Sequence, residues 1–192
     1  FEIFKKAQTP WEWHSKIFKR AKQKGLIFFS SPFDERAVDF LGSLKVPFYK
    51  IASAENIHFP LLKKVAKTNK PIIISTGMIS IKELDEVVSY VRKLGAKNIT
   101  LLKCTTEYPA KPKESNILTI PYLKKRYKCD VGLSDHTPGI GVSIAAIALG
   151  ASVIEKHLTL NRKDGAIDSF FSLEPDEFKS LVNESRSAHE SL

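Results

Sequence analysis

The sequence contains only two cysteines, Cys104 and Cys129, and no CxxC spacing. Two cysteines cannot form the disulfide framework of a small secreted protein, and the absence of CxxC removes the usual zinc-binding and redox motifs. We expect both cysteines to be buried thiols. The chain also has no G-x-G-x-x-G, Walker or H-E-x-x-H motif, so the usual signals of nucleotide hydrolysis and zinc proteolysis are missing.

Long hydrophobic runs are absent as well. No stretch approaches the roughly 18 uninterrupted apolar residues of a membrane-spanning helix. The N-terminus begins FEIFKK, without the charged-then-apolar order of a signal peptide. We therefore expect a cytoplasmic protein with no membrane partner. Apolar residues make up 43% of the chain and aromatic residues 10%, which is enough for a globular core.

The net charge of the 192-residue chain is +9, but its lysines are spread along the expected helices without an Arg-rich block. We interpret them as solvated helix faces and expect no nucleic-acid partner. Two alternatives stay open. The positive charge attracts a multiply anionic small substrate, or the chain is a basic nucleic-acid-binding domain whose binding is strongly salt-dependent and needs no metal.

Short runs rich in β-branched residues alternate with amphipathic stretches along the chain. The expected strands are residues 26–30, 48–52, 71–75, 99–103, 131–134 and 152–157. The expected helices are residues 10–24, 34–44, 58–68, 81–94, 116–127, 141–149 and 175–189. This alternation predicts an α/β fold with parallel strands joined by right-handed crossovers.

Two architectures fit this order, an open doubly wound sheet and a (β/α)8 TIM barrel. Polar or reactive residues end nearly every expected strand, which favours the barrel because its chemistry gathers at the C-terminal ends of many strands. Only about six of the eight strands of a closed barrel are recognisable. We therefore interpret residues 1–192 as a partial TIM-barrel catalytic domain.

Side-chain alternation predicts which residues face the barrel axis. The period of two in a strand places Gly132, Ser134 and His136 on one side, and the apolar residues between them on the side that packs against helices. The same alternation in the preceding strand places Lys103 toward the axis and Cys104 toward the helices. This placement supports the interpretation of Cys104 as an ordinary buried thiol.

His136 and His157 are the leading candidates for a metal site because they end consecutive expected strands. In a parallel barrel they would lie side by side, and two neutral imidazoles can share a divalent cation. The alternative is a pair of ordinary histidines at the barrel rim. Asp135 is opposite in parity and is expected to orient a neighbouring loop, whereas Glu155 shares the side of His157 and would support it.

A second set of strand-end residues suits an anion. Lysine supplies a point charge, and serine hydroxyls with the backbone amides after Ser75 can hold phosphate or carboxylate oxygens. The members are Lys50, Ser53, Ser75, Lys103 and Ser134. The alternatives are a Schiff-base lysine, as in aldolase-like barrels, and lysines that only extend to the solvent at the rim.

Several of these residues belong to segments that resemble the sialic acid (nonulosonic acid) synthase family. The segments occur in the family's order and span nearly the whole chain. They are KIASAE at 50–55, ISTGM at 74–78, KCTTEYP at 103–109, GLSDHT at 132–137, EKHLT at 155–159 and SLEP at 172–175. The resemblance implies an aldolase-type TIM barrel that condenses phosphoenolpyruvate with an amino sugar and releases phosphate.

The resemblance also implies roles for individual positions. Residues that match Lys50, Ser53, Ser75 and Ser134 hold phosphoenolpyruvate, and Lys103 belongs to the same expected anion site. Residues that match His136 and His157 bind Mn²⁺ or Mg²⁺ as the cofactor. The expected catalytic residues are therefore His136, His157 and Lys50. Tyr108 and Asp168 match positions near the sugar, and Glu55 is expected to support Lys50.

Within the family, residues 164–175 are most similar to the pseudaminic acid synthase branch. Thr106 agrees, because the neuraminate branch tends to have asparagine there. The implied substrate is a 6-deoxy-2,4-diacetamido hexose. The alternatives are an N-acetylneuraminate or legionaminate synthase and, outside this family, a seven-carbon sugar-acid synthase.

Two parts typical of the family are not recognisable in the sequence. Family members have N-terminal strands with a glutamate near the metal, and a C-terminal antifreeze-like domain whose arginine reaches the partner's active site in a domain-swapped homodimer. We expect the parent protein to form such a dimer. A non-catalytic remnant that keeps the fold is the remaining alternative.

Overall fold

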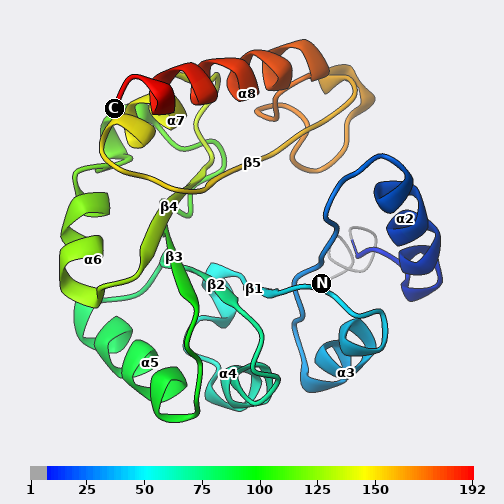
Figure 1. The fold of residues 1–192 in the computed structure, drawn as a ribbon. Coiled ribbons are helices and arrows are strands. Elements are labelled where there is room, and N and C mark those ends of the chain that lie inside the picture. Colours follow the sequence, from blue (N-terminus) through cyan, green and yellow to red (C-terminus); the bar gives the residue numbers. More distant parts are fainter. Residues whose placement is uncertain (1–7) are drawn as a thin grey trace.

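The computed structural model describes residues 8–192; the N-terminal residues used for the signal-peptide expectation lie outside them. Five parallel strands form one curved sheet in the order in which they occur in the chain, with helices around its outer side (Figure 1). The strands are β1 (Tyr49–Ile51), β2 (Ile72–Ser75), β3 (Ile99–Cys104), β4 (Asp130–Asp135) and β5 (Ile154–Lys156). The prediction of a partial α/β barrel is confirmed.

Seven α-helices are described, and each lies within a few residues of a predicted one. They are α2 (Trp11–Gln23), α3 (Glu35–Ser43), α4 (Phe59–Ala66), α5 (Ile81–Lys93), α6 (Thr119–Tyr127), α7 (Gly141–Ala148) and α8 (Pro175–Glu190). The largest difference is at α6, which begins at Thr119 because Asn116 has a positive φ of 45° that a right-handed helix cannot contain.

The predicted strand at 26–30 is wrong. These residues have no regular secondary structure, and Leu26 and Ile27 are 66% and 71% exposed. A strand requires a neighbour for its backbone hydrogen bonds. In the described part of the chain, β1 pairs only with β2, so the sheet ends at β1. An apolar run without a ladder partner does not become a strand.

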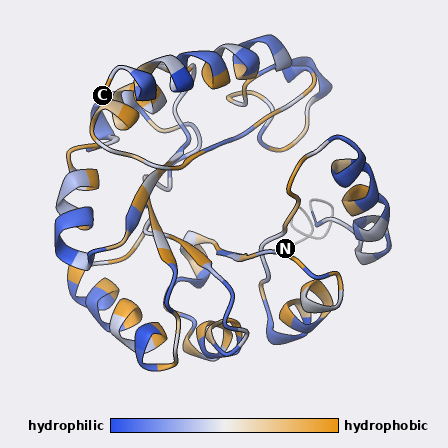
Figure 2. Cartoon of the chain, in the orientation of Figure 1, coloured by the Kyte–Doolittle hydropathy of each residue, from blue (hydrophilic) through white to orange (hydrophobic). Residues whose placement is uncertain are grey.

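The hydrophobic core lies between the sheet and its surrounding helices. In α5, Leu84, Val87 and Val91 recur at helical spacing and are all buried against the sheet. The helix starts with the predicted capping box, in which the Ser80 hydroxyl accepts from the Glu83 N–H and the Glu83 carboxylate accepts from the Ser80 N–H. Figure 2 shows the apolar sides of several helices turned toward the strands.

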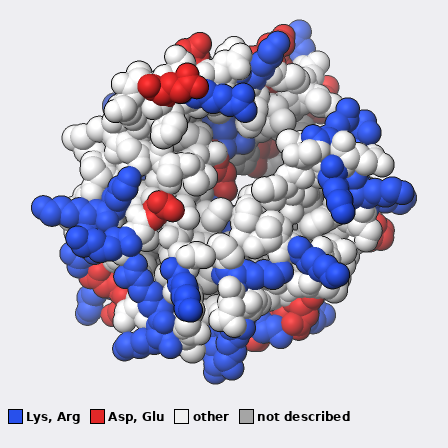
Figure 3. Space-filling view, viewed as in Figure 1, with Lys and Arg blue, Asp and Glu red and all other residues white. Residues whose placement is uncertain are grey.

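The lysines lie mainly on solvated helix faces, as predicted. Lys16, Lys19 and Lys22 of α2 are all exposed. Figure 3 shows Lys and Arg side chains at many separate places around the outer edge of one face of the molecule. In residues 8–192, no helix has both the length and the apolar character needed to cross a bilayer.

Gly132 allows β4 and β5 to approach closely. A Cβ atom at this position would lie 2.2 Å from the Val153 carbonyl oxygen and 2.7 Å from Leu102 Cδ2. The Val153 carbonyl accepts the Leu133 N–H at 2.8 Å, so it cannot move without loss of that bond between the strands. The glycine is therefore required by the register of the two strands that end at the candidate site.

We predict that Gly132→Ala lowers the free energy of unfolding by about 1–3 kcal/mol, because the new methyl group forces the strand backbones apart. Gly141→Ala is the matched control, since nothing lies within 4 Å of a Cβ there and its φ is not positive. Urea unfolding followed by circular dichroism would measure both. Equal stability of the two variants would contradict this account of Gly132.

Candidate active site

The carboxyl ends of the strands bring polar side chains to one end of the sheet. The register aligns Cys104 with Ser134 and Ser134 with Glu155, so these three side chains lie on the same face of the sheet. His136 and His157 follow β4 and β5 directly. The opposite face carries core residues such as Leu133. The site therefore faces the barrel axis.

Lys50, Ser75, Ser134 and Glu155 form a connected cluster. The Lys50 Nζ donates to Ser75 Oγ at 2.8 Å and lies 3.4 Å from Glu155 Oε2. The Ser134 hydroxyl donates to Glu155 Oε1 at 2.7 Å. Lys50 is only 5% exposed, so its charge acts in a poorly solvated environment. The cluster contains one ammonium group and two hydroxyl groups. The Glu155 carboxylate contacts the ammonium group of Lys50 and the hydroxyl of Ser134.

The turn after β2 lies against Ser53 and Thr106. The Gly77 N–H donates to Ser53 Oγ at 3.1 Å. A Cβ at Gly77 would lie 2.0 Å from Thr106 Oγ1 and 2.7 Å from Ser53 Oγ, so no larger residue fits. Asn56, which the sequence analysis missed, donates to the carbonyls of Ser75 and Gly77 at 3.2 and 2.9 Å. Its buried amide fixes the turn beside the Lys50 cluster.

Glu55 ends the short helix that begins at Ser53. Its Oε2 atom is buried without a hydrogen-bond partner among the described residues. Burial raises the pKa of this carboxyl group, and the charges of His58 and Lys50 partly offset that effect. The expected support of Lys50 by Glu55 is thus an electrostatic influence and not a direct ion pair.

His136 and His157 lie side by side, with ring centroids 5.3 Å apart. The His136 Nδ1 is 2.8 Å from the Thr105 carbonyl oxygen, which can only accept, so Nδ1 carries a proton and Nε2 keeps its lone pair. The His157 Nδ1 is 3.6 Å from Asp168 Oδ2. The His157 Nδ1 thus faces a carboxylate, and a proton on Nδ1 of each ring would leave two Nε2 lone pairs, the arrangement usual for metal-binding imidazoles.

The two imidazoles differ in their proton affinity. Burial acts to lower the pKa of His136, but hydrogen bonds with Cys104 and the Thr105 carbonyl outweigh it and raise the pKa. Burial lowers the pKa of His157, and the nearby charge of His136 lowers it further. A cation that binds both rings must therefore compete with a proton mainly at His136.

Cys104 and Lys103 occupy the reverse of their predicted faces. The register pairs Lys103 with Leu133, a core residue, and Cys104 with Ser134. The prediction was wrong because the period of two orders the side chains of one strand, whereas the neighbouring strand decides which set faces the axis. Lys103 Nζ bonds to Thr105 Oγ1 at 2.5 Å and to the Cys104 carbonyl at 3.4 Å, and is not in the Lys50 cluster.

The Cys104 thiol is consequently part of the site. Burial acts to raise its pKa, but hydrogen bonds with His136, Ser53 and Thr106 outweigh that effect and lower the pKa to about 7. Its Sγ is 3.8 Å from Thr106 Oγ1. The thiol interacts with both the Ser53 turn and His136. Cys104 is buried as expected, but it does not face the helices, and Cys129 is only partly buried. For Lys103, burial lowers the pKa of the amine.

Aromatic side chains cover the histidine pair. The Tyr108 ring lies 4.2 Å from the ring of His136 and 6.0 Å from that of His157. Phe171, a buried residue that the sequence analysis missed, lies 4.9 Å from His157. Burial raises the pKa of Tyr108 to about 12, so its phenol keeps its proton and can donate a hydrogen bond. This cover shields one side of the imidazoles from water.

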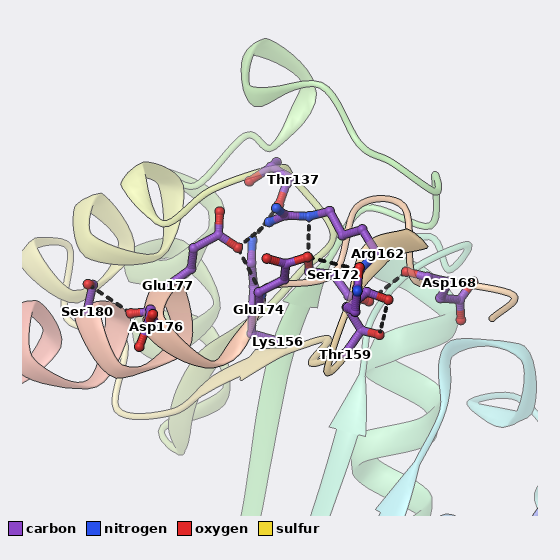
Figure 4. Close-up of polar contacts among 11 residues, drawn as sticks. Thr137, Lys156, Thr159, Arg162, Asp168, Ser172, Glu174, Asp176, Glu177 and Ser180 are labelled. Atoms are coloured by element: carbon purple, nitrogen blue, oxygen red, sulfur yellow. Dashed lines mark hydrogen bonds and ion pairs between the residues drawn. The ribbon is translucent and has the colours of Figure 1, made fainter. Parts of the chain in front are cut away.

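The loop after β5 is held in place by Arg162. Its backbone N–H donates to Glu174 Oε1 and its Nε to the Ser172 carbonyl, both at 3.0 Å, and its guanidinium also pairs with Glu177 (Figure 4). The Ser172 hydroxyl in turn donates to the Asp168 carbonyl at 2.6 Å. These bonds connect the start of α8 to the loop that places Asp168 beside His157.

The chain matches known proteins over its full length. A family model described as the NeuB family covers residues 1–192. The chain is 45% identical, over 100% of its length, to the N,N'-diacetyllegionaminic acid synthase of Campylobacter jejuni. It is 44% identical, over 95% of its length, to the pseudaminic acid synthase of Helicobacter pylori. It covers 58% and 54% of these two proteins, little more than half of each.

Solved structures share the fold. The N-acetylneuraminic acid synthetase of Leptospira borgpetersenii, solved with citrate, has a TM-score of 0.95 and 32% identity over 99% of this chain and 66% of that one. The DAHP synthase of Thermotoga maritima, at 22% identity, shows similarity of fold alone, with a TM-score of 0.84 over 96% of this chain and 59% of that one. The match of the family model to every residue, with these identities to sugar-acid synthases, shows that the chain belongs to the NeuB family.

Proposed function

We propose that the chain is the larger part of a barrel that condenses phosphoenolpyruvate with the open-chain form of an amino sugar to give a nonulosonic acid and phosphate. One observation carries the proposal. Glu155 bonds to both Lys50 and Ser134 on the same face of the sheet that ends in the His136 and His157 pair. A cluster suited to an anion and a pair suited to a cation are therefore neighbours.

The residues present fit a divalent cation in part. His136 and His157 would hold it through Nε2, because Nδ1 of each ring faces an oxygen acceptor. In residues 8–192, no three His, Cys, Asp or Glu side chains are grouped so that they could hold a metal ion. The remaining positions would therefore be filled by water, substrate or groups outside these residues. When bound, Mn²⁺ or Mg²⁺ supplies Lewis acidity toward an aldehyde oxygen.

Other side chains of this chain would bind phosphoenolpyruvate and orient the sugar. Lys50, Ser75 and Ser134 would hold the phosphate or carboxylate of phosphoenolpyruvate, and the incoming anion would compete with Glu155 for these donors. Asp168 and the phenol of Tyr108 would orient the sugar from the histidine side. These contacts would bring C3 of phosphoenolpyruvate within reach of the aldehyde carbon, which is the main requirement for rapid bond formation.

The overall reaction then balances as follows. A bond forms between C3 of phosphoenolpyruvate and C1 of the sugar, and the aldehyde oxygen takes a proton. Water adds at C2, and the C2–O bond to phosphate breaks to leave a keto acid and inorganic phosphate. We class the enzyme as a transferase, and because phosphoenolpyruvate is a metabolite of the cytoplasm we place it there.

We further propose a 6-deoxy-2,4-diacetamido hexose as the sugar and, among the products that such a sugar can give, pseudaminic acid. Support comes from the sequence of residues 164–175 and from Thr106, which lies against the Gly77 turn. Ile167 and Phe170 flank Asp168 and are 50% and 57% exposed. Apolar side chains at these positions suit a methyl group better than a hydroxymethyl group.

The direct test measures phosphate release from phosphoenolpyruvate in the presence of Mn²⁺. The protein used contains this chain and is as long as the relatives that it matches. We predict release with the 6-deoxy-diacetamido sugar and at least 10-fold less with N-acetylmannosamine, a difference of about 1.4 kcal/mol. Release with N-acetylmannosamine alone would move the protein to the neuraminate branch. No release with either sugar from folded, Mn²⁺-loaded protein would refute the function.

A second prediction concerns Lys50. Lys50→Met keeps the apolar stem but removes the charge, so the KM for phosphoenolpyruvate should rise about 10- to 100-fold, as expected for loss of a hydrogen bond to a charged group. The KM for the sugar should change little. Lys82→Met, on the exposed side of α5, is the matched control. An unaltered KM for phosphoenolpyruvate in Lys50→Met would remove this residue from the anion site.

A further inference from the structure

A buried ion pair, Asp135 with Lys156, lies behind the two site histidines. Asp135 Oδ2 is 2.8 Å from Lys156 Nζ, and both side chains are 1% exposed. Asp135 also accepts from the Thr137 N–H at 2.8 Å, from the Thr137 hydroxyl at 2.7 Å and from the Ser143 hydroxyl at 2.6 Å. Lys156 donates in addition to the Thr137 carbonyl (Figure 4). The pair is thus fully surrounded by protein partners.

The position of this pair relates it to both histidines. Asp135 and Lys156 are paired in the register of β4 and β5, one residue before His136 and His157. Because side chains alternate along a strand, the pair lies on the face opposite Ser134 and the site. It therefore joins the backbone that carries one histidine to the backbone that carries the other, without touching the space in front of them.

Stability alone does not account for a pair of this kind. The free-energy cost of removing both charges from water offsets most of their mutual attraction. Apolar side chains of similar volume often hold two elements together equally well. The ion pair differs from apolar packing in that its hydrogen bonds have direction. Asp135 holds the Thr137 N–H and Lys156 holds the Thr137 carbonyl, so the peptide groups just after His136 are fixed relative to β5.

We infer that Asp135 and Lys156 are positioning residues that set the separation of His136 and His157, so that the two imidazoles can hold one divalent cation. This inference rests on the proposed function. Ser143 also belongs to this hydrogen-bond network, because its hydroxyl connects Asp135 to the first turn of α7. In residues 8–192, no hydrogen bond joins Asp135 or Lys156 to an imidazole, so the positioning acts through the backbone of the two strand ends.

The test compares Mn²⁺ binding by wild-type protein and Asp135→Asn, at full length and without substrate, from the electron paramagnetic resonance signal of free Mn²⁺. We expect the Mn²⁺ dissociation constant to rise about 10- to 100-fold, the effect usual for a group that orients metal-binding histidines. At saturating Mn²⁺, kcat should return toward the wild-type value. A merely structural role would lower the number of binding sites and leave the dissociation constant of the folded fraction unchanged.

Two further variants complete the comparison. Asp85→Asn breaks an exposed pair with Arg126 on the outer surface and should leave Mn²⁺ binding unaltered. Ser143→Ala removes a single hydrogen bond from Asp135 and, if Asp135→Asn fails to fold, serves in its place with an expected rise in the dissociation constant of about 2- to 10-fold. Unchanged Mn²⁺ affinity in the folded variant would overturn the positioning role.

His157→Ala separates failure of this inference from failure of the proposed function. If His157→Ala loses Mn²⁺ binding while Asp135→Asn and Ser143→Ala keep it, the positioning role is wrong and the histidine site stands. If His157→Ala binds Mn²⁺ as tightly as the wild type, the metal assignment fails, and the positioning role fails with it.

Discussion

The register between β4 and β5 is the constraint on which the site depends. It aligns Ser134 with Glu155 on the axis face and Asp135 with Lys156 on the opposite face. A slip of β5 by one residue against β4 would bring Lys156 to the axis face and turn Glu155 away from it, so both ion pairs would be lost. Gly132 permits this register, because any side chain there would collide with the Val153 backbone. One glycine in the strand thus has consequences for the chemistry at its end.

Charged groups near the strand ends are neutralised locally on each face. Lys50 has Glu155 on the axis side, and Lys156 has Asp135 behind the sheet. A buried charge without a partner would cost several kcal/mol, so each contact is needed for the cluster to exist without ligand. The two pairs differ in exposure: Glu155 is 37% exposed in its side chain, whereas Asp135 and Lys156 are 1% exposed. The first pair can exchange a partner with an incoming anion, and the second cannot.

Local sequence patterns predicted most of the fold. Helical spacing and the Ser80 capping box identified α5, and the strand-end positions of His136 and His157 were enough to expect them side by side. Three-dimensional context decided the rest. Residues 26–30 look like a strand but have no ladder partner, and Cys104 faces the axis because β4 fixes the register of β3. Asn56 and Phe171 carry no spacing signal, since their contacts come from turns that only the folded chain brings to the site.

The most direct measurement of the central claim is the crystal structure of the full-length protein with Mn²⁺ and phosphoenolpyruvate, using anomalous diffraction to locate the ion. The account predicts the Mn²⁺ peak between the Nε2 atoms of His136 and His157, with the phosphoenolpyruvate oxygens on Lys50, Ser75 and Ser134. An ion bound elsewhere, or phosphoenolpyruvate bound away from Lys50, would contradict the claim that one face of this sheet holds the two groups as neighbours.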